Sequence, residues 1–140
     1  MRNSIRLFAL ALLVLSGPAP AAAGDVRVIA NSNVSSSAIS PEDLKSIFLG
    51  AKTSFGGSTV EPVLAQQGGA HDEFLKEFVG KTDAALRNHF KSLVFTGKGS
   101  MPKSLPSDAA IVQYVAKTKG AIGYVSGSSA VTGVKVIQIQ

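Results

Sequence analysis

The side chains best suited to chemistry gather in one polar turn and just behind it. The turn consists of four residues, Gln66, Gln67, Gly68 and Gly69, and His71 follows closely. Amide groups donate hydrogen bonds, and imidazole becomes a cation below about pH 6.5, so this set suits a small oxyanion. The apolar run before the turn, Val60–Ala65, is typical of a strand. Ligands of open α/β sheets bind beyond the carboxyl ends of strands, so we expect any small-molecule site here.

Hydrolysis is a further function that these residues suggest, because His71 stands beside the carboxylate of Asp72. Neighbouring residues of a helix point about 100° apart, so these two side chains do not form a relay. The sequence also lacks a serine in a nucleophile elbow and the His, Asp and Glu spacing of a metal site. We therefore expect a protein that is not an enzyme and that has no metal or cofactor.

A second polar loop, Asn31-Ser32-Asn33, follows the strand-like run Val26–Ala30. Its amide and hydroxyl groups are also suitable donors to an oxyanion. Asn and Ser are equally common in loops for a structural reason, because they bond their own backbone. Both interpretations stay open from the sequence.

Residues 1–23 are typical of an export signal. Arg2 and Arg6 precede the apolar run Leu7–Leu15, and small residues stand before Gly24. The apolar run is shorter than the about 20 residues that span a bilayer. We expect cleavage near Ala23 and Gly24, which leaves one domain, residues 24–140, in the periplasm or outside the cell.

Charge and cysteine content narrow the functional classes. The formal net charge of +5 falls to +3 without Arg2 and Arg6. The lysines are scattered singly and are not interleaved with aromatic residues, so we expect no nucleic-acid binding. The chain has no cysteine, which excludes disulfides, thiolate metal sites and a lipoprotein anchor.

The surrounding elements follow from capping and periodicity. Predicted helices begin at three residues that can cap them, Ser40, Thr82 and Ser107. Three helices are predicted to end on a phenylalanine that docks on the core and a glycine that stops the helix: Phe48 with Gly50, Phe78 with Gly80, and Phe95 with Gly97.

Four strands are expected, near residues 26–30, 60–65, 121–125 and 134–139. The segment Lys103–Pro106 is interpreted as a linker. The sequence therefore predicts an α/β domain with a mixed, mostly parallel sheet of about four strands flanked by about four helices.

Three blocks carry a resemblance to a known family: Ile47–Gly50, Phe95–Gly97 with Pro102, and Gly120–Val125. Together they resemble the periplasmic-binding-protein type 2 domain of phosphate ABC transporter substrate-binding proteins, especially short, single-domain exported members. The resemblance implies a single lobe of this fold and binding of phosphate or a similar small oxyanion. It also implies an ABC permease or another envelope protein as partner.

The resemblance further implies that the phosphate site combines both polar loops. Its candidate residues here are Asn31, Ser32, Asn33, Gln66, Gln67, Gly68, Gly69 and His71. Full-length relatives carry an arginine in the turn, and this chain has none, so we expect weak binding. Pairing of two chains to complete a cleft is left open. The alternative is an envelope interaction module that keeps the fold without binding solute.

Overall fold

The computed structural model describes residues 26–140, so the predicted export signal lies outside the described residues. Four α-helices form in this part of the chain, and the second continues directly into a π-helical turn, η1. Their bounds are α1 (Pro41–Phe48), α2 (Gly69–Phe74), η1 (Leu75–Val79), α3 (Asp83–Phe95) and α4 (Asp108–Lys117). None of the helices within residues 26–140 is long and apolar enough to cross a membrane.

A six-stranded sheet in the order β2-β8-β1-β7-β5-β6 forms the centre of the domain. Strand β1 alone runs antiparallel to its neighbours, and the other five strands share one direction. A separate two-stranded hairpin pairs β3 with β4. The bounds are β1 (Val26–Ala30), β2 (Ala38–Ile39), β3 (Ser54–Phe55), β4 (Ser58–Thr59), β5 (Glu61–Ala65), β6 (Lys103–Leu105), β7 (Ala121–Ser126) and β8 (Lys135–Ile139).

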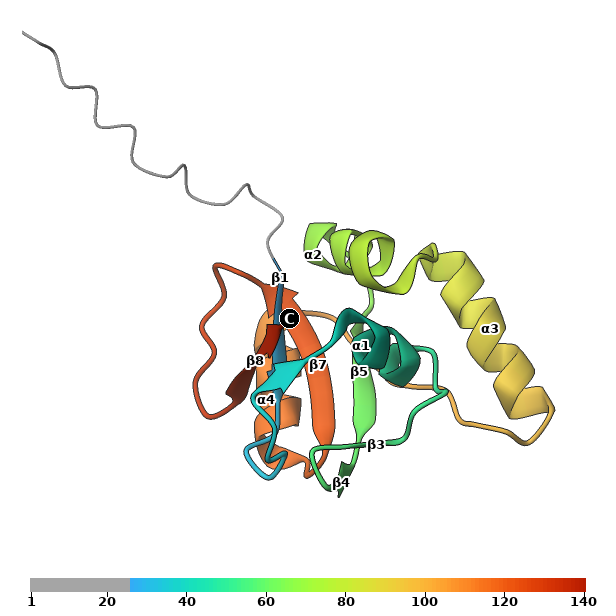
Figure 1. Cartoon of the computed structure of the whole chain (residues 1–140). Helices are drawn as coiled ribbons and strands as arrows, with labels where there is room; N and C mark the ends of the chain where they lie inside the picture. The colour runs from blue at the N-terminus through green and yellow to red at the C-terminus, as the bar shows by residue number, and fades with distance from the viewer. Residues whose placement is uncertain (1–25) are drawn as a thin grey trace, which may run out of the picture.

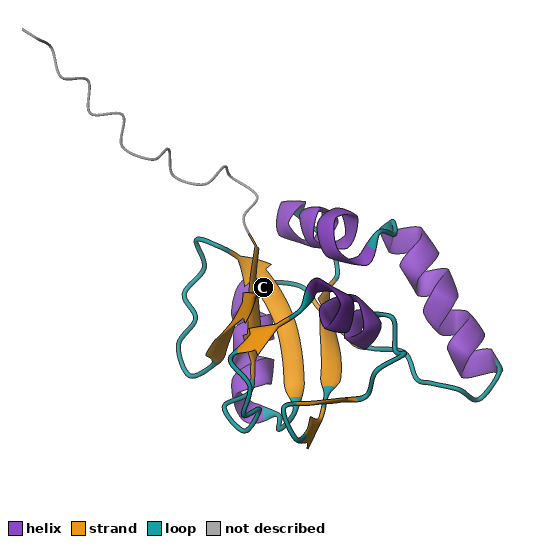
Figure 2. Cartoon of the chain, viewed as in Figure 1, coloured by secondary structure: helices purple, strands orange, loops and turns teal. Residues whose placement is uncertain are grey.

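Helices cover both faces of this sheet (Figures 1 and 2). Two neighbouring residues of β7 show the layers, because successive strand residues point to opposite faces. Tyr124 lies against the rings of Phe48 in α1 and Phe74 in α2. Gly123 faces α4, where a Cβ atom would lie 3.0 Å from the side chain of Ile111. The glycine therefore allows α4 to approach the sheet closely, as its place in a buried strand suggests.

The predicted fold class is confirmed, with two short strands added at the edges of the sheet. The interpretation of Lys103–Pro106 as a linker is wrong, because Lys103–Leu105 forms β6 and pairs in parallel with β5. Three residues of mixed polarity carry no alternating pattern, so periodicity could not identify this strand.

The predicted helix starts are confirmed by their caps. The hydroxyl oxygens of Ser40, Thr82 and Ser107 accept hydrogen bonds from backbone N–H groups three residues later, at 3.1, 3.2 and 3.1 Å. Gly50 ends α1 with a φ of +74°. A Cβ atom there would lie 3.1 Å from the ring of Phe90 in α3. This glycine therefore serves both the turn and the contact between the two helices.

The prediction that Phe95 docks on the core is wrong. Phe48 is fully buried, whereas 94% of the Phe95 surface is exposed. Helix α3 contacts the body of the domain through its earlier residues Leu86 and Phe90, and its last turn extends away from the sheet (Figure 1). The glycine stop after it forms as predicted, with a φ of +71° at Gly97. The local sequence thus specifies the end of the helix but not what lies beside it.

Candidate functional site

The polar turn Gln66–Gly69 lies beyond the carboxyl ends of β5, β6 and β7, on the side of the sheet where these three strands end. These three strands are parallel neighbours, so their carboxyl ends meet at the same edge. The turn directly follows β5 and leads into α2, and all four of its residues are exposed. This edge is where open α/β sheets bind ligands.

The backbone of this turn has hydrogen-bond donors to spare. The N–H group of Gln66 donates to the carbonyl oxygen of Leu105 in β6 at 2.9 Å, which fixes the start of the turn. Within residues 26–140, the N–H groups of Gln67 and Gly68 donate to no backbone or side-chain acceptor. Gly68 has a φ of +117°, which favours glycine, and a Cβ atom added there would meet no atom within 4 Å. The turn therefore presents free donors to solvent.

The second predicted loop, Asn31–Asn33, lies at the opposite edge of the sheet. Its strand β1 runs antiparallel to β7, so that Ala30 pairs with Ile122 near the start of β7. The two loops are separated by the length of a five-residue strand, roughly 16 Å. The expectation that both loops form one phosphate site is thus corrected: the structure does not bring them together. The sequence pattern gave no strand directions, and one antiparallel strand is enough to separate the loops.

The asparagine side chains of this loop form hydrogen bonds to α4 and to the residue before β7. The Asn31 side chain is buried, and its Nδ2 atom donates to the carbonyl oxygens of Val115 and Ala116 at 2.8 and 3.2 Å. Its Oδ1 atom accepts from the N–H of Asn33 at 3.0 Å. The Asn33 side chain in turn accepts from the N–H of Gly120 at 2.8 Å. The structural interpretation of these asparagines, left open by the sequence, accounts for their amide groups.

His71 lies inside the domain, with both of its ring nitrogens engaged. Only 1% of its surface is exposed. Its Nδ1 atom contacts the hydroxyl group of Tyr124 in β7, and its Nε2 atom lies 2.7 Å from Oδ1 of Asp83 in α3. A histidine in this position has no free nitrogen to offer to an anion in the turn.

Tyr124 joins His71 to strand β5. The Tyr124 oxygen accepts from the N–H of Ala65 at 3.0 Å and lies in contact with Nδ1 of His71. The Nε2–H group of His71 donates to Asp83. Burial raises the pKa of Tyr124, which keeps its hydroxyl proton in place. His71 therefore links Tyr124 to Asp83 inside the domain, with both ring nitrogens engaged.

Asp83 joins this buried chain of polar groups to the surface. Its Oδ2 atom accepts from Nε of Arg87, one turn further along α3, at 2.8 Å. This hydrogen bond, aided by the one from His71, lowers the pKa of the Asp83 carboxyl group below its ordinary value of 3.8. Residues from β7, α2 and α3 are thus linked through four side chains. Local sequence patterns place each of these residues on an element, but they do not pair the residues across elements.

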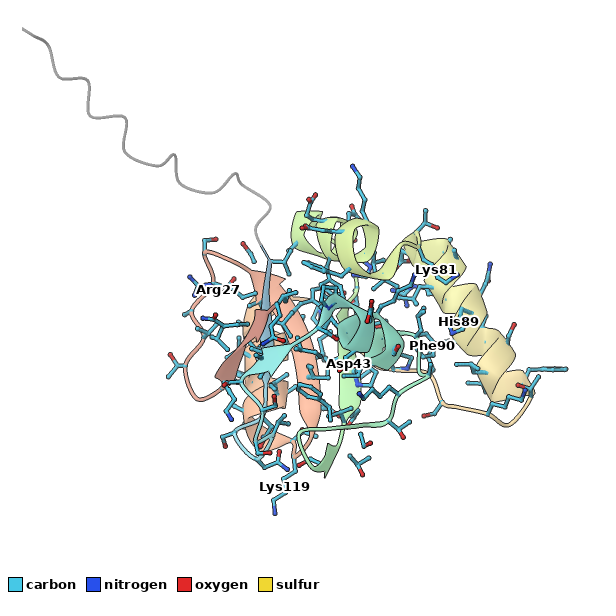
Figure 3. The ribbon with its side chains drawn as sticks, in the orientation of Figure 1. Arg27, Asp43, Lys81, His89, Phe90 and Lys119 are labelled. Carbon is cyan, nitrogen blue, oxygen red and sulfur yellow. The ribbon has the colours of Figure 1, made fainter. Side chains whose placement is uncertain are left out.

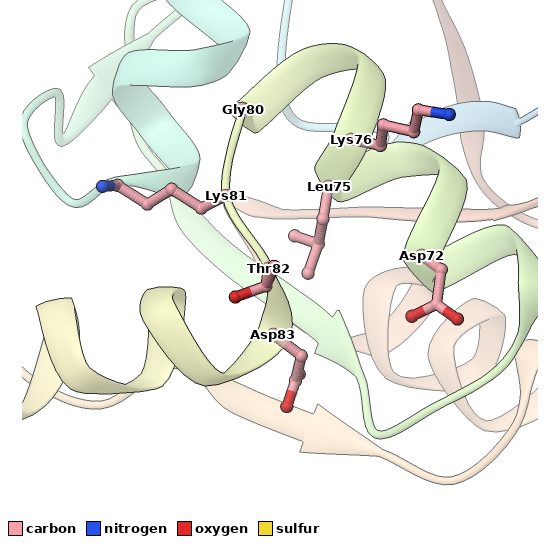
Figure 4. Close-up of a pocket in the computed structure, with 7 residues that line it drawn as sticks. All are labelled: Asp72, Leu75, Lys76, Gly80, Lys81, Thr82 and Asp83. Atoms are coloured by element: carbon pink, nitrogen blue, oxygen red, sulfur yellow. The ribbon is translucent and has the colours of Figure 1, made fainter.

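A groove of about 440 Å³ lies beside Asp83, where η1 joins α3. Its lining includes two carboxylates, those of Asp72 and Asp83. Figure 4 shows Lys76 and Lys81 extending away from the other lining side chains, in opposite directions. The lining carries two carboxylates and two lysines, so the groove has no excess of positive charge to attract the expected anion. Within residues 26–140, no group of His, Asp and Glu side chains is arranged to hold a metal ion.

A serine-rich loop after β7 also reaches the edge that carries the turn, and the sequence analysis did not select it. Its polar groups are used internally. The Asp108 carboxylate accepts from the N–H of Ser126 at 3.0 Å and from the hydroxyl of Ser129 at 2.5 Å. The Asp108 carboxylate and the Ser129 hydroxyl are therefore occupied within the domain.

Comparisons with known proteins agree with this architecture. No protein-family model matches the sequence, and no protein of curated function is significantly similar to it. Solved structures do match. An ABC-type phosphate transport receptor from Vibrio cholerae superposes with a TM-score of 0.62 at 18% identity, over 81% of this chain and 45% of that one.

A phosphate ABC transporter substrate-binding protein from Clostridium perfringens, solved with bound phosphate, superposes with a TM-score of 0.63 at 20% identity. The match covers 81% of this chain and 44% of that one. PstS from Borrelia burgdorferi superposes with a TM-score of 0.63 at 11% identity, over 82% and 47% of the two chains.

These likenesses show that the chain has the fold found in phosphate-binding proteins of ABC transporters. The resemblance stated from the sequence is confirmed at this level. The chain spans less than half the length of the structures it matches.

Proposed function

We propose that this protein is an exported, non-catalytic solute-binding lobe that captures phosphate or a similar small oxyanion weakly at the turn Gln66–Gly69. One observation carries the proposal: free backbone donors stand at the carboxyl edge of parallel strands in a fold shared with phosphate-binding proteins. Backbone N–H groups that converge in a turn form a concave donor site for anions. The cleaved export signal, the periplasmic location and delivery to an ABC permease belong to the same proposal.

The affinity follows from which contacts the turn offers. Gln67 and the backbone donate neutral hydrogen bonds, which are roughly half as strong as those from a guanidinium. The turn is open to water on one side, since its residues are exposed. Ligand sites that bind tightly bury most of their ligand. We therefore expect saturable binding in the millimolar range, about 4 kcal/mol.

Calorimetric titration of the exported, processed protein with phosphate tests this proposal, with sulfate as the second oxyanion. Replacing Gln67 by Ala removes a donor and should weaken binding roughly tenfold. Gly68→Ala should also weaken binding, because its φ of +117° disfavours alanine. The matched control is Gly97→Ala, which also has a positive φ and open surroundings but lies away from the turn. Absence of saturable heat from the unaltered protein would contradict the proposal.

The runner-up function is an envelope interaction module that keeps the fold without binding solute. A specific observation favours it: the turn lacks a cation, since it contains no arginine and His71 is buried with both nitrogens bonded. Binding of phosphate at about pH 6 and about pH 8 separates the two functions. The solute-binding lobe gives saturation at both pH values, whereas the interaction module gives none. With sulfate, whose charge is the same at both pH values, the affinity should change little, because the donors of the turn do not titrate.

A further inference from the structure

The far end of α3 carries exposed apolar side chains that the solute site does not use. We define the α3 tip as residues 91–101, the last turn of α3 and the loop that follows. Its exposed apolar members are Val94, Phe95 and Met101, which are 49%, 94% and 45% exposed. Phe95 therefore contacts almost nothing of its own chain.

The same tip is positively charged. Lys91 stands one turn before Phe95, on the same face of the helix, and both are exposed. The loop after Gly97 turns back, so that the N–H of Lys98 bonds to the carbonyl oxygen of Leu93 at 2.8 Å. Lys98 is therefore held close to the end of the helix. From residue 84 to residue 107 the sequence has no Asp or Glu.

We propose that the α3 tip docks the protein on an anionic lipid surface, with Phe95 inserted at the boundary of headgroups and acyl chains. The lysines lie beside it, where long basic side chains keep their apolar stems in the interface and their ammonium groups on the lipid phosphates. Each lysine near such a surface strengthens binding roughly fivefold. Lys91 and Lys98 thus place positive charge before and after Phe95 in the sequence, which complements anionic headgroups.

The shape of the tip favours lipid over a protein partner. Helix α3 extends from the body of the domain (Figure 1), and Figure 3 shows His89 and Phe90 on its side toward the body. His89 is bonded to the carbonyl oxygen of Leu49 at 2.7 Å, which holds the helix in this position. A stable protein interface buries about 800 Å² on each partner, more than three apolar side chains supply. A bilayer accepts a protruding side chain without a complementary surface.

The absence of tryptophan from the sequence allows a direct test. In the variant Phe95→Trp, the only tryptophan reports on the tip. We expect its emission to shift to the blue on addition of vesicles of equal parts phosphatidylglycerol and phosphatidylcholine, and not with phosphatidylcholine alone. Binding should weaken as salt is raised, since screening reduces the attraction between exposed charges. The experiment uses the exported, processed protein, whose N-terminus is checked by mass spectrometry.

Cosedimentation of the unaltered protein and single variants provides the controls. Phe95→Ser should abolish most vesicle binding, and Lys91→Gln and Lys98→Gln should each weaken it roughly fivefold. Matched changes away from the tip, Val136→Ser and Lys119→Gln, should have no effect; both residues are exposed.

Two kinds of result would overturn the proposal. The first is equal vesicle binding by all variants, or none by the unaltered protein. The second is a blue shift of the Phe95→Trp emission that depends on protein concentration without vesicles, because a second copy of the chain would then cover the tip.

Discussion

Two polar loops of similar composition differ in where their hydrogen bonds go. In the loop Asn31–Asn33, the amide of Asn31 reaches the last carbonyl groups of α4, and the amide of Asn33 holds the start of β7. In the turn Gln66–Gly69, the N–H groups of Gln67 and Gly68 have no partner within residues 26–140. The comparison teaches that a polar loop is available to a ligand only when the fold leaves its donors unused.

The largest expected effect comes from Asn31→Ala, which sharpens this comparison. The change removes three hydrogen bonds and leaves the carbonyl groups of Val115 and Ala116 without this donor. We expect a loss of about 2–4 kcal/mol in the free energy of unfolding. Urea denaturation measures it.

The matched change in the other loop is Gln67→Ala, which should alter stability by less than about 0.5 kcal/mol. Similar losses of stability in the two variants would mean that the two loops contribute equally to the fold, which contradicts the comparison.

A smaller loss is expected from Tyr124→Phe, which tests how much the hydrogen bonds of the hydroxyl group, one of them to Ala65 just before the turn, contribute to stability. The ring keeps its stacking on Phe74, at 3.9 Å between centroids, but Ala65 and His71 lose a hydrogen-bond partner. The cost should be about 1–3 kcal/mol in the free energy of unfolding.

The same substitution has a pH signature. Burial raises the pKa of Tyr124 above its ordinary value of 10.0, so the unfolded chain ionises first. The stability linked to this group is present below pH 10.0 and is lost as the pH rises above that value. Tyr124→Phe should therefore flatten the alkaline decline, and an unchanged decline would show that the hydroxyl is not buried in this way.

The smallest effect is expected at low pH from Asp83, the surface end of the buried chain. Its pKa is lowered chiefly by the hydrogen bond from Arg87. The resulting stability is present above pH 3.8 and is lost as the pH falls through the lowered value. Because 37% of the Asp83 side chain is exposed, screening should keep the contribution well below 1 kcal/mol. Urea midpoints between about pH 6 and about pH 3 should decline less in Asp83→Asn than in the unaltered protein.

Much of the fold could be predicted from local signals. Helix starts at Ser40, Thr82 and Ser107 and stops at Gly50 and Gly80 depend on neighbouring residues, and the structure confirms them. Strand β6 was missed because its pairing with β5, forty residues earlier in the chain, is not a local property.

The candidate site was harder to predict, because it depends on relations between distant residues. The antiparallel direction of β1 moves Asn31 away from the turn. His71 is buried because Tyr124 and Asp83, from other elements, bond both of its nitrogens. Phe95 is exposed because α3 extends past the body. Composition and spacing name the polar residues, but only the fold decides which of them remain free.

The most direct test of the central claim is a phosphate titration of the ¹⁵N-labelled protein followed residue by residue in amide NMR spectra. We expect saturable shifts at the amides of Gln67, Gly68 and Gly69, with those of Asn31, Ser32 and Asn33 unmoved. Shifts centred on Asn31–Asn33, or no saturable shift at the turn at millimolar phosphate, would contradict it.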